Sequence, residues 1–182
     1  VRPDPYHVWL SEVMLQQTQV VTARPYYDAF LARFPTLPAL ARAKPSDVLA
    51  SWAGLGYYRR ARDLHRTAAA IVERHDGRVP DDLDALLALP GIGAYTARAV
   101  LALAFEYDHG VVDTNVARVL ARAVTGEPMT ATRVQRLADT LVPAGAAWLH
   151  NQALLDLGAT VCTARSPRCE VCPLAGGCVW RG

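Results

Sequence analysis

The sequence predicts an all-α protein. Apolar residues recur at the helical period along nearly the whole chain, and Gly and Pro separate the periodic stretches. The one extended candidate, Gly110-Val111-Val112, is too short to form a sheet. Hydrophobic residues make up 52% and charged residues 20% of the 182 residues, which supports a sizeable core and argues against intrinsic disorder. The sequence shows no signal peptide and no apolar run of the ~18 residues that a membrane-spanning helix needs, so we expect no membrane association.

Local start and stop signals predict the helices of the first half. The first helix begins at Asp4-Pro5, an N-cap followed by proline at the first helical position. The next helices run over 26–34, which ends before a proline, and from 45 to about 54, where Gly-Leu-Gly follows. A long amphipathic pattern over 59–75 stops at a glycine, and a short helix over 82–89 ends at Pro-Gly.

The second half continues in the same way. An Ala-rich helix is expected over 95–105, and Asp113 or the following threonine caps a helix that extends to 123. Thr130 caps a helix that runs to 141 and stops before a proline. The last helix is expected over 148–157, directly before the cysteines.

The cysteines are clustered at the end of the chain. Cys162, Cys169, Cys172 and Cys178 lie together, whereas the preceding 161 residues contain none. This distribution is unlike a disulfide framework and indicates a metal loop in a reducing compartment. The spacing C-x6-C-x2-C-x5-C differs from the paired C-x2-C units of a zinc ribbon, and four thiolates in so short a loop can surround a cubane cluster. From the residues alone, structural zinc remains the alternative.

A Gly/Pro turn between two helices provides a candidate phosphate site. In Leu89-Pro90-Gly91-Ile92-Gly93, the proline ends one helix, and Gly91 and Gly93 permit a tight turn before the next. Unpaired N–H groups at the start of that helix can bind a phosphate without a basic side chain. The turn resembles a helix-hairpin-helix element, although an ordinary connecting turn is the simpler interpretation. Because the net charge is only +2, any nucleic-acid contact must be local.

Two carboxylates are candidates for acid–base chemistry. Glu12 interrupts the mostly apolar stretch 9–15, so it either faces a cleft or is buried with partners. Burial raises the pKa of a carboxyl group and suits it to proton transfer near neutral pH. Asp113 follows two valines and precedes a helix. Each residue also has a simpler interpretation, a solvent-facing side chain for Glu12 and a plain N-cap for Asp113.

Together, these features resemble the DNA glycosylase superfamily that combines a helix-hairpin-helix, a Gly/Pro loop and a catalytic Asp. The resemblance covers 4–178, with the hairpin at 89–99, the Asp loop at 111–116 and cysteines spaced as in the family. It is most specific to the adenine glycosylases of the MutY type, which remove adenine mispaired with guanine or 8-oxoguanine. The stretches that carry this likeness are WLSEVMLQQTQV over 9–20, GLGYY over 54–58 and NQALLDLGA over 151–159.

The resemblance implies catalytic roles. Glu12 protonates the extruded adenine, which then leaves as a neutral base, and later handles the water. Asp113 stabilises the oxocarbenium-like sugar by its charge or by a transient covalent bond. Tyr95 and Asn115 line the pocket and support the two carboxylates. Tyr95 also takes the position of the Schiff-base lysine of the bifunctional endonuclease III type, and the single lysine, Lys44, lies far from this motif, which disfavours a lyase step.

The resemblance also implies contacts with DNA. Gln17 and Tyr57 match residues that enter the base stack opposite the extruded base, with Gln16 beside them. A core aromatic is the simpler interpretation of Tyr57. The hairpin residues grip the DNA backbone, and Arg165 and Arg168 in the cysteine loop meet phosphates.

The implied architecture is a two-lobed helix-hairpin-helix DNA glycosylase fold. We expect a helical barrel lobe over 3–108 and a second lobe over 109–182, which carries Asp113 and a 4Fe-4S cluster held by the four cysteines. We expect a monomer that acts on double-stranded DNA with a mismatched or damaged base pair. Its expected location is the bacterial cytoplasm, at the nucleoid.

Two alternatives stay open. Thymine/uracil glycosylases that act opposite guanine share the hairpin, the tyrosine, the aspartate and the cluster, and they end near the cluster, as this chain does. The stretches around Glu12 and Tyr57 favour the adenine branch, whose members usually carry a further C-terminal domain, so we expect a catalytic domain alone or a naturally short protein. The second alternative is a non-catalytic iron–sulfur DNA-binding module, against which the pairing of Glu12 with Asp113 argues.

Overall fold

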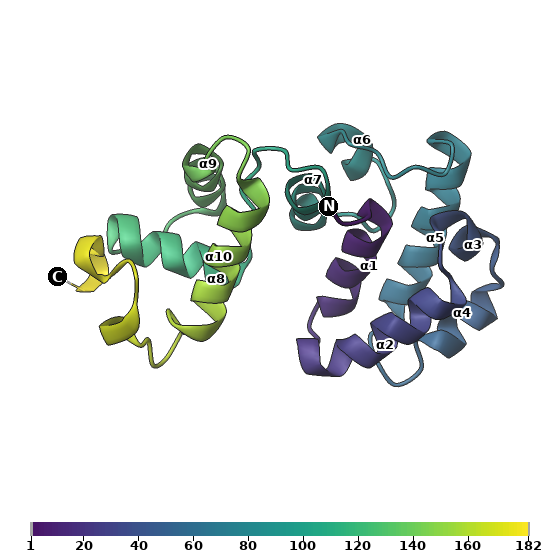
Figure 1. Cartoon of the computed structure of the whole chain (residues 1–182), viewed down its shortest axis with the longest axis horizontal. Helices are drawn as coiled ribbons and strands as arrows, with labels where there is room; N and C mark the ends of the chain where they lie inside the picture. Colours follow the sequence, from purple (N-terminus) through teal and green to yellow (C-terminus); the bar gives the residue numbers. More distant parts are fainter. Residues whose placement is uncertain (1, 182) are drawn as a thin grey trace. The chain divides into compact units, whose positions relative to one another are not determined.

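The structure is a computed structural model that describes residues 2–181 (Figure 1). Its described residues form helices joined by loops and contain no strand, which confirms the predicted all-α class. The chain divides into two compact units, Val1–Phe105 and Glu106–Gly182. None of the described helices combines the length and the apolar character that crossing a membrane requires.

The helices of the first unit pack mainly on α1 and α5. Its elements are α1 (Pro5–Leu15), α2 (Val20–Arg33), α3 (Leu37–Arg42), α4 (Pro45–Ser51), α5 (Arg59–Arg74), α6 (Leu83–Leu87) and α7 (Ala94–Ala104). The helix α1 packs against α2, α5 and α7, while α3 and α4 pack against α5. The largest side chains of the core come from several of these helices and include Trp9, Leu10, Phe30, Trp52 and Leu64.

Side-chain caps explain where these helices begin. Asp4 accepts a hydrogen bond from the backbone N–H of Tyr6 at 2.8 Å, and Pro5 follows at the first position of α1, as predicted. Asp82 accepts from the backbone N–H of Ala85 at 2.8 Å and begins α6 in the same way. The chain therefore enters both helices at positions that its local sequence specifies.

Two parts of the first unit differ from the prediction. The helix expected from residue 26 begins at Val20, and Pro25 lies inside it. Val20 and Val21 are 67% and 77% exposed, so water can reach the turn in which Pro25 removes an N–H donor. The short helix α3 was not predicted, because six residues that include a proline resemble a turn. Thr36 caps α3 by accepting from the backbone N–H of Ala39 at 3.2 Å.

The second unit packs three helices around a small core. Its elements are α8 (Thr114–Leu120), α9 (Ala131–Leu141) and α10 (Ala147–Thr160), followed by the short 3-10 turns η2 (Cys169–Val171), η3 (Ala175–Gly177) and η4 (Val179–Arg181). The helix α8 contacts both α9 and α10. The buried residues at its centre are Val116, Leu120, Val134 and Ala138.

The helix predicted to reach residue 123 changes character after Leu120. The segment η1 (Ala121–Thr125) is a π-helical turn. The carbonyl of Ala121 accepts hydrogen bonds from the Thr125 hydroxyl and from the backbone N–H of Gly126, both at 2.9 Å, which holds the turn in its wider form. This turn packs against η4, so it joins α8 to the end of the chain.

Candidate functional site

Asp113 lies where α8 begins. Its Oδ1 accepts a hydrogen bond from the backbone N–H of Val116 at 2.7 Å, and its Oδ2 accepts one from Asn115 Nδ2 at 2.9 Å. Asp113 is therefore the N-cap of α8, as its simpler interpretation predicts. The two hydrogen bonds also fix the directions in which its carboxylate oxygens point. Donors of this kind stabilise the negative charge of a carboxylate. The arrangement presents an oriented anion at the start of the helix.

A chain of hydrogen bonds joins Asp113 to the cysteine loop. Arg118 Nη2 donates to Asn115 Oδ1 at 2.8 Å and to the carbonyl of Gly158 at 2.7 Å, and Arg118 Nε donates to the carbonyl of Cys162 at 2.9 Å. Asn115 is thus held on one side by Arg118 and donates on the other side to Asp113. The sequence predicted Asn115, but it did not predict Arg118, whose partners Gly158 and Cys162 lie 40 and 44 residues away along the chain.

The helices α8 and α10 come very close at Gly158. A Cβ atom at this position would lie 2.7 Å from the Cβ of Asn115 and 3.0 Å from its carbonyl carbon. Such distances lie well inside van der Waals contact, so only glycine permits this approach. The missing side chain at Gly158 therefore allows α10 to support the residue that contacts Asp113.

Asn151 holds the backbone that leads to Asp113. It is 1% exposed, and its Oδ1 accepts from the backbone N–H of Val111 at 2.8 Å. Its Nδ2 donates to the carbonyls of His109 and Ala147, both at 2.9 Å. All of its polar atoms are therefore paired inside the unit. In the sequence, Asn151 stands out only as a polar residue within a largely apolar helical stretch.

The four cysteines surround one cavity. All four are half-buried and free of disulfide bonds, and Arg122 and Trp180 line the same cavity. Within residues 2–181, no three His, Cys, Asp or Glu side chains converge closely enough to hold a single metal ion. In a 4Fe-4S cluster each thiolate binds a different iron, so the ligands surround a volume. The donor set of four free thiols fits such a cluster.

A second arginine anchors the cysteine loop. Arg122 donates to the carbonyls of Thr163 and Ala164 at 2.8 and 3.0 Å, and its Nη1 lies 3.6 Å from Cys162 Sγ. Its guanidinium also stacks 4.4 Å from the ring centroid of Trp180. Because η2, η3 and η4 contain no fully buried residue, these polar contacts contribute to the order of this loop, and a bound cluster would add to it.

The first unit carries Glu12 and Tyr95. Glu12 lies on α1, and Tyr95 lies in the first turn of α7, the helix that packs against α1. Both side chains are half-buried. Glu12 therefore does not lie on a fully solvent-exposed face of α1. Its neighbours Val13 and Trp9, the latter one turn earlier, are both buried.

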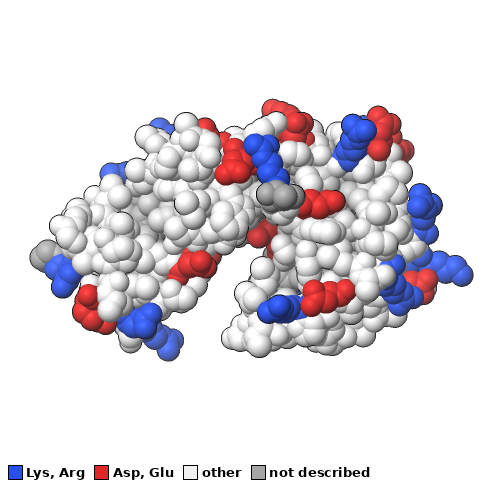
Figure 2. All heavy atoms as spheres, in the orientation of Figure 1, with Lys and Arg blue, Asp and Glu red and all other residues white. Residues whose placement is uncertain are grey.

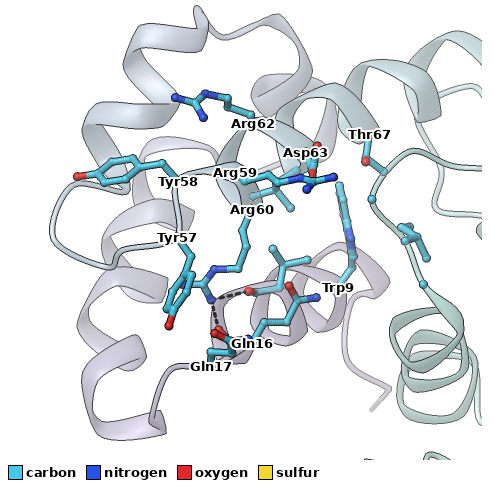
Figure 3. Close-up of a pocket in the computed structure, with 15 residues that line it drawn as sticks. Trp9, Gln16, Gln17, Tyr57, Tyr58, Arg59, Arg60, Arg62, Asp63 and Thr67 are labelled. Carbon is cyan, nitrogen blue, oxygen red and sulfur yellow. Dashed lines mark hydrogen bonds and ion pairs between the residues drawn. The ribbon is translucent and has the colours of Figure 1, made fainter.

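The predicted wedge residues lie around one cavity of the first unit. Gln16, Gln17 and Tyr57 all line this cavity, which has a volume of about 780 Å³ (Figure 3). Gln17 and Tyr57 have φ angles of 55° and 49°, so both adopt the left-handed conformation that non-glycine residues rarely take. Tyr57 is 60% exposed, so its interpretation as a core aromatic is wrong.

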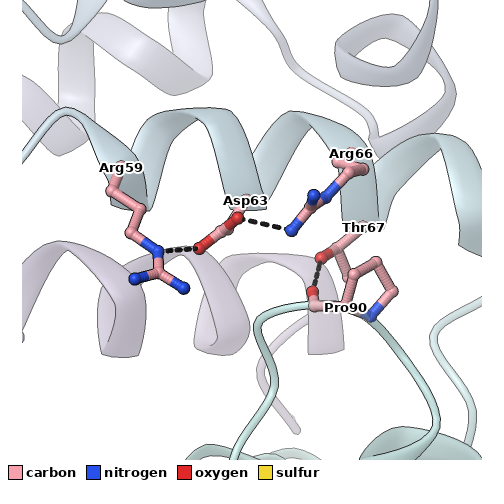
Figure 4. Close-up of polar contacts among 5 residues, drawn as sticks. All are labelled: Arg59, Asp63, Arg66, Thr67 and Pro90. Carbon is pink, nitrogen blue, oxygen red and sulfur yellow. Dashed lines mark hydrogen bonds and ion pairs between the residues drawn. The ribbon is translucent and has the colours of Figure 1, made fainter.

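The Gly/Pro turn is tied to α5. The Thr67 hydroxyl donates to the carbonyl of Pro90, and Asp63 on the same helix forms ion pairs with Arg59 and Arg66 (Figure 4). Gly91 has a φ angle of 79°, and a Cβ there would lie 2.8 Å from the Cβ of Asp63. The turn can therefore sit against α5 only if position 91 is glycine.

The hairpin residues differ in exposure. Gly91 and Gly93 are exposed, and α7 begins after Gly93 without a side-chain cap. Leu89, in contrast, is 3% exposed. The Leu89 side chain therefore belongs to the core, and the expected contact of Leu89 with DNA stays a prediction that concerns its backbone.

Positive charge is distributed locally. Arg165 and Arg168 are both exposed on the cysteine loop, where phosphates could reach them. Figure 2 shows one face of the molecule, on which basic and acidic residues are interspersed and much of the surface is uncharged. On that face there is no broad basic surface, in agreement with the small net charge of +2.

Two family models match the chain. A model described as "HhH-GPD superfamily base excision DNA repair protein" matches residues 10–144. A model described as "Iron-sulfur binding domain of endonuclease III" matches residues 162–178. The second match includes all four cysteines and confirms the predicted 4Fe-4S cofactor.

Known proteins resemble most of the chain. The adenine DNA glycosylase of Mycolicibacterium smegmatis is 49% identical over 179 residues, which is 97% of this chain and 61% of that protein. The adenine DNA glycosylase of Homo sapiens is 46% identical over 95% of this chain and 33% of its own length. The chain therefore spans less than two thirds of these relatives. A solved structure of a thermostable thymine-DNA glycosylase has a TM-score of 0.91 and 31% identity, covering 98% of this chain and 84% of that one.

Proposed function

Because the chain belongs to the HhH-GPD superfamily of base excision DNA repair proteins, we propose that it is a monofunctional DNA glycosylase that removes adenine mispaired with guanine or 8-oxoguanine. The observation that carries this proposal is the Asp113 carboxylate, which Val116 and Asn115 hold in fixed directions. The choice of adenine is supported by the 49% identity to a relative named adenine DNA glycosylase.

The two carboxylates divide the chemistry between them. Glu12, as a carboxylic acid, gives its proton to a ring nitrogen of the extruded adenine. The bond between the sugar C1′ and the base then breaks, and its electron pair leaves with adenine as a neutral base. Water adds to C1′ and returns a proton to the Glu12 carboxylate. This sequence restores the enzyme and consumes one water for each base released.

Asp113 acts on the sugar. As the glycosidic bond breaks, positive charge develops on C1′ and the ring oxygen, and an oriented anion lowers the energy of that state. Because Asn115 and the backbone of Val116 already orient the carboxylate, little reorganisation is needed during the reaction. Tyr95 takes the place of a Schiff-base lysine, so we propose hydrolysis without a lyase step.

Different residues contact the base stack and the phosphates of the DNA. Gln17 and Tyr57, with Gln16 beside them, fill the base stack when the target nucleotide leaves it. Gly91 and Gly93 present backbone N–H groups to a phosphate. The 4Fe-4S cluster, when bound, supplies a cross-link that orders the loop over 162–178. Arg165 and Arg168 on this loop then meet phosphates without reading sequence.

A thymine glycosylase is the second candidate. It is supported by the TM-score of 0.91 and the 31% identity to a solved thymine-DNA glycosylase. The adenine proposal rests on the higher identity of 49% to an adenine enzyme and on the half-buried acid Glu12. Adenine is a poor leaving group as an anion, which is why its release requires a proton donor.

Base release under single-turnover conditions tests the proposal. Three duplexes are compared, with adenine opposite 8-oxoguanine, adenine opposite guanine, and thymine or uracil opposite guanine. Asp113→Asn serves as the blank, because asparagine can still cap α8 and the fold is retained. Release of adenine that Asp113→Asn reduces by at least about 100-fold supports the proposal. Release of thymine or uracil alone assigns the second candidate, and no release from any duplex refutes both.

A further inference from the structure

The cavity beside the predicted wedge contains a buried arginine. Arg60 is 9% exposed, although arginine is among the residues least often buried. Its side chain reaches from α5 into the space between the loop after α1 and the loop before α5 (Figure 3). Burial lowers the pKa of the guanidinium. Burying the charged Arg60 side chain costs desolvation free energy. Its hydrogen bonds must offset that cost, so we ask which groups they hold.

Every side-chain hydrogen bond of Arg60 goes to one of two segments, either the end of α1 with the loop that follows it or the loop before α5. Nη1 donates to the carbonyls of Val13 and Met14 at 3.0 and 2.8 Å, and also to the carbonyl of Gln16. Nη2 donates to Thr18 Oγ1 at 3.1 Å. These four acceptors belong to the end of α1 and the loop that contains Gln17.

The second loop is held by the same guanidinium. Nη2 also donates to the carbonyls of Leu55 and Gly56 at 3.4 and 3.3 Å, directly before Tyr57. Arg60 Cζ lies 5.4 Å from the ring centroid of Tyr57 and 5.4 Å from that of Trp52. Trp52 Nε1 donates to the Gly56 carbonyl at 3.0 Å, which fixes this loop from its other side.

Both loops contain a strained residue at the position that the guanidinium supports. Gln17 and Tyr57 have φ angles of 55° and 49°. Non-glycine residues keep such angles only where their surroundings hold them, and this strain is typical of functional sites. The Arg60 contacts lie on both sides of Gln17 and immediately before Tyr57. The same side chain therefore holds the two strained residues together.

We infer that Arg60 is the positioning residue of the wedge: it fixes Gln17 and Tyr57 as one rigid unit before DNA arrives. This inference rests on the proposed function, in which those two residues fill the base stack. A wedge that is rigid in the free protein loses no conformational freedom when it enters DNA. The planar fork of five N–H donors can reach two loops at once, whereas the three N–H donors of lysine radiate from one nitrogen.

Arg60→Lys is the discriminating variant, because it keeps a cationic residue and removes the fork. In the free protein, hydrogen exchange is measured at the backbone amides of residues 13–18 and 54–58. We expect exchange in both segments to accelerate together. Extrusion is measured in Asp113→Asn protein by the fluorescence of 2-aminopurine placed at the target position opposite guanine. Because misplacement by about 1 Å costs on the order of 100-fold, we expect extrusion to fall 10- to 100-fold.

A matched control separates positioning from stability. Leu40→Ala removes a fully buried side chain from α3, which also packs against α5 and belongs to neither loop. We expect it to lower the thermal midpoint at least as much as Arg60→Lys and to leave extrusion within about twofold of the wild type. An equal loss of extrusion in Leu40→Ala would overturn the inference.

A double variant tests the link to Tyr57. If Arg60 acts through the wedge, Arg60→Lys costs less extrusion in the Tyr57→Ala background than in the wild type, so the losses of the double variant are less than additive. Additive losses would show that Arg60 acts elsewhere and would overturn the inference. A wild-type chain that binds the duplex without any rise in fluorescence would refute the proposed wedge itself. The exchange experiment then decides, without DNA, whether Arg60 couples the two loops.

Discussion

The side chains of Arg118 and Asn115 share a hydrogen bond of 2.8 Å, and through it the cysteine loop is connected to Asp113. Arg118 holds the carbonyl of Cys162, while Asn115 donates to the Asp113 carboxylate. Three hydrogen bonds in series thus join the residue proposed to stabilise the sugar to a proposed ligand of the cluster. The order of the cysteine loop and the orientation of the carboxylate are therefore coupled within the second unit.

Arg118→Lys should reduce base release about tenfold, because a lysine ammonium cannot replace the planar guanidinium that donates to Asn115, Gly158 and Cys162 at once. DNA affinity should change by less than twofold. Single-turnover release and fluorescence anisotropy measure the two quantities. Arg133→Lys, at an exposed position on α9, is the matched control and should behave as the wild type. Equal losses in both variants would argue against the connection.

Gly91→Ala and Gly93→Ala should differ in stability. At position 91 the added Cβ meets Asp63 at 2.8 Å, and the φ angle of 79° is unfavourable for alanine. We expect a loss of about 1–3 kcal/mol in the free energy of unfolding. At position 93 no atom beyond the adjoining residues lies within 4 Å of the added Cβ, so the change should stay within about 0.5 kcal/mol. Urea unfolding measures both, and similar values for the two variants would contradict the packing of the turn on α5.

Local sequence predicted most of the helices because their caps are local. Asp4, Asp113 and Thr130 each accept a hydrogen bond from a residue two or three positions later, so the signal is contained in a few letters. The start of α2 was missed, because a proline normally ends a helix and the exposure that tolerates Pro25 is a tertiary property.

The sequence predicted those residues of the candidate site that stand in local motifs. Asp113 and the cysteines stand in short contiguous motifs, so their chemistry could be proposed from spacing. Arg60 and Arg118 could not be recognised in that way. Arg60 is 46 residues from its partner Met14, and Arg118 is 44 residues from Cys162. Nothing in the local sequence distinguishes such an arginine from a solvated one.

Removal of the iron–sulfur cluster should loosen the second unit alone. The residues of η2, η3 and η4 include no fully buried side chain, so the loop loses a source of order when a chelator extracts the iron. We expect limited proteolysis within 162–181 to accelerate at least about tenfold. Cleavage within Val1–Phe105 should stay unchanged, because that unit has its own core. Equal acceleration in both units would contradict this assignment.

His150 should make the second unit less stable in mild acid. Burial lowers the pKa of its imidazole below 6.5, and its buried Nε2 has no hydrogen-bond partner. Between 6.5 and the lower folded pKa, the unfolded chain binds more protons than the folded chain, so stability falls as the pH falls through that window. The slope cannot exceed about 1.4 kcal/mol per pH unit. Thermal unfolding of His150→Leu should show this slope reduced, and an unchanged slope would refute the assignment.

Replacing Arg165 and Arg168 together by glutamine should weaken binding to all duplexes alike. Each lost phosphate contact should lower the slope of log affinity against log salt by about one. Titrations at several salt concentrations with matched and mismatched duplexes measure this. The same charge change at the exposed residues Arg74 and Arg78 is the control. A selective loss for mismatched duplexes would instead assign base recognition to the cysteine loop.

The contact between Gly158 and Asn115 predicts the effect of natural substitutions at position 158. A Cβ at position 158 would lie 2.7 Å from the Cβ of Asn115, so even the smallest substitution must separate α10 from α8. Such a variant would have intact carboxylates, intact cysteines and an unchanged charge. It would nevertheless be expected to behave as a loss-of-function allele, and an inspection limited to catalytic and ligand positions would classify it as benign.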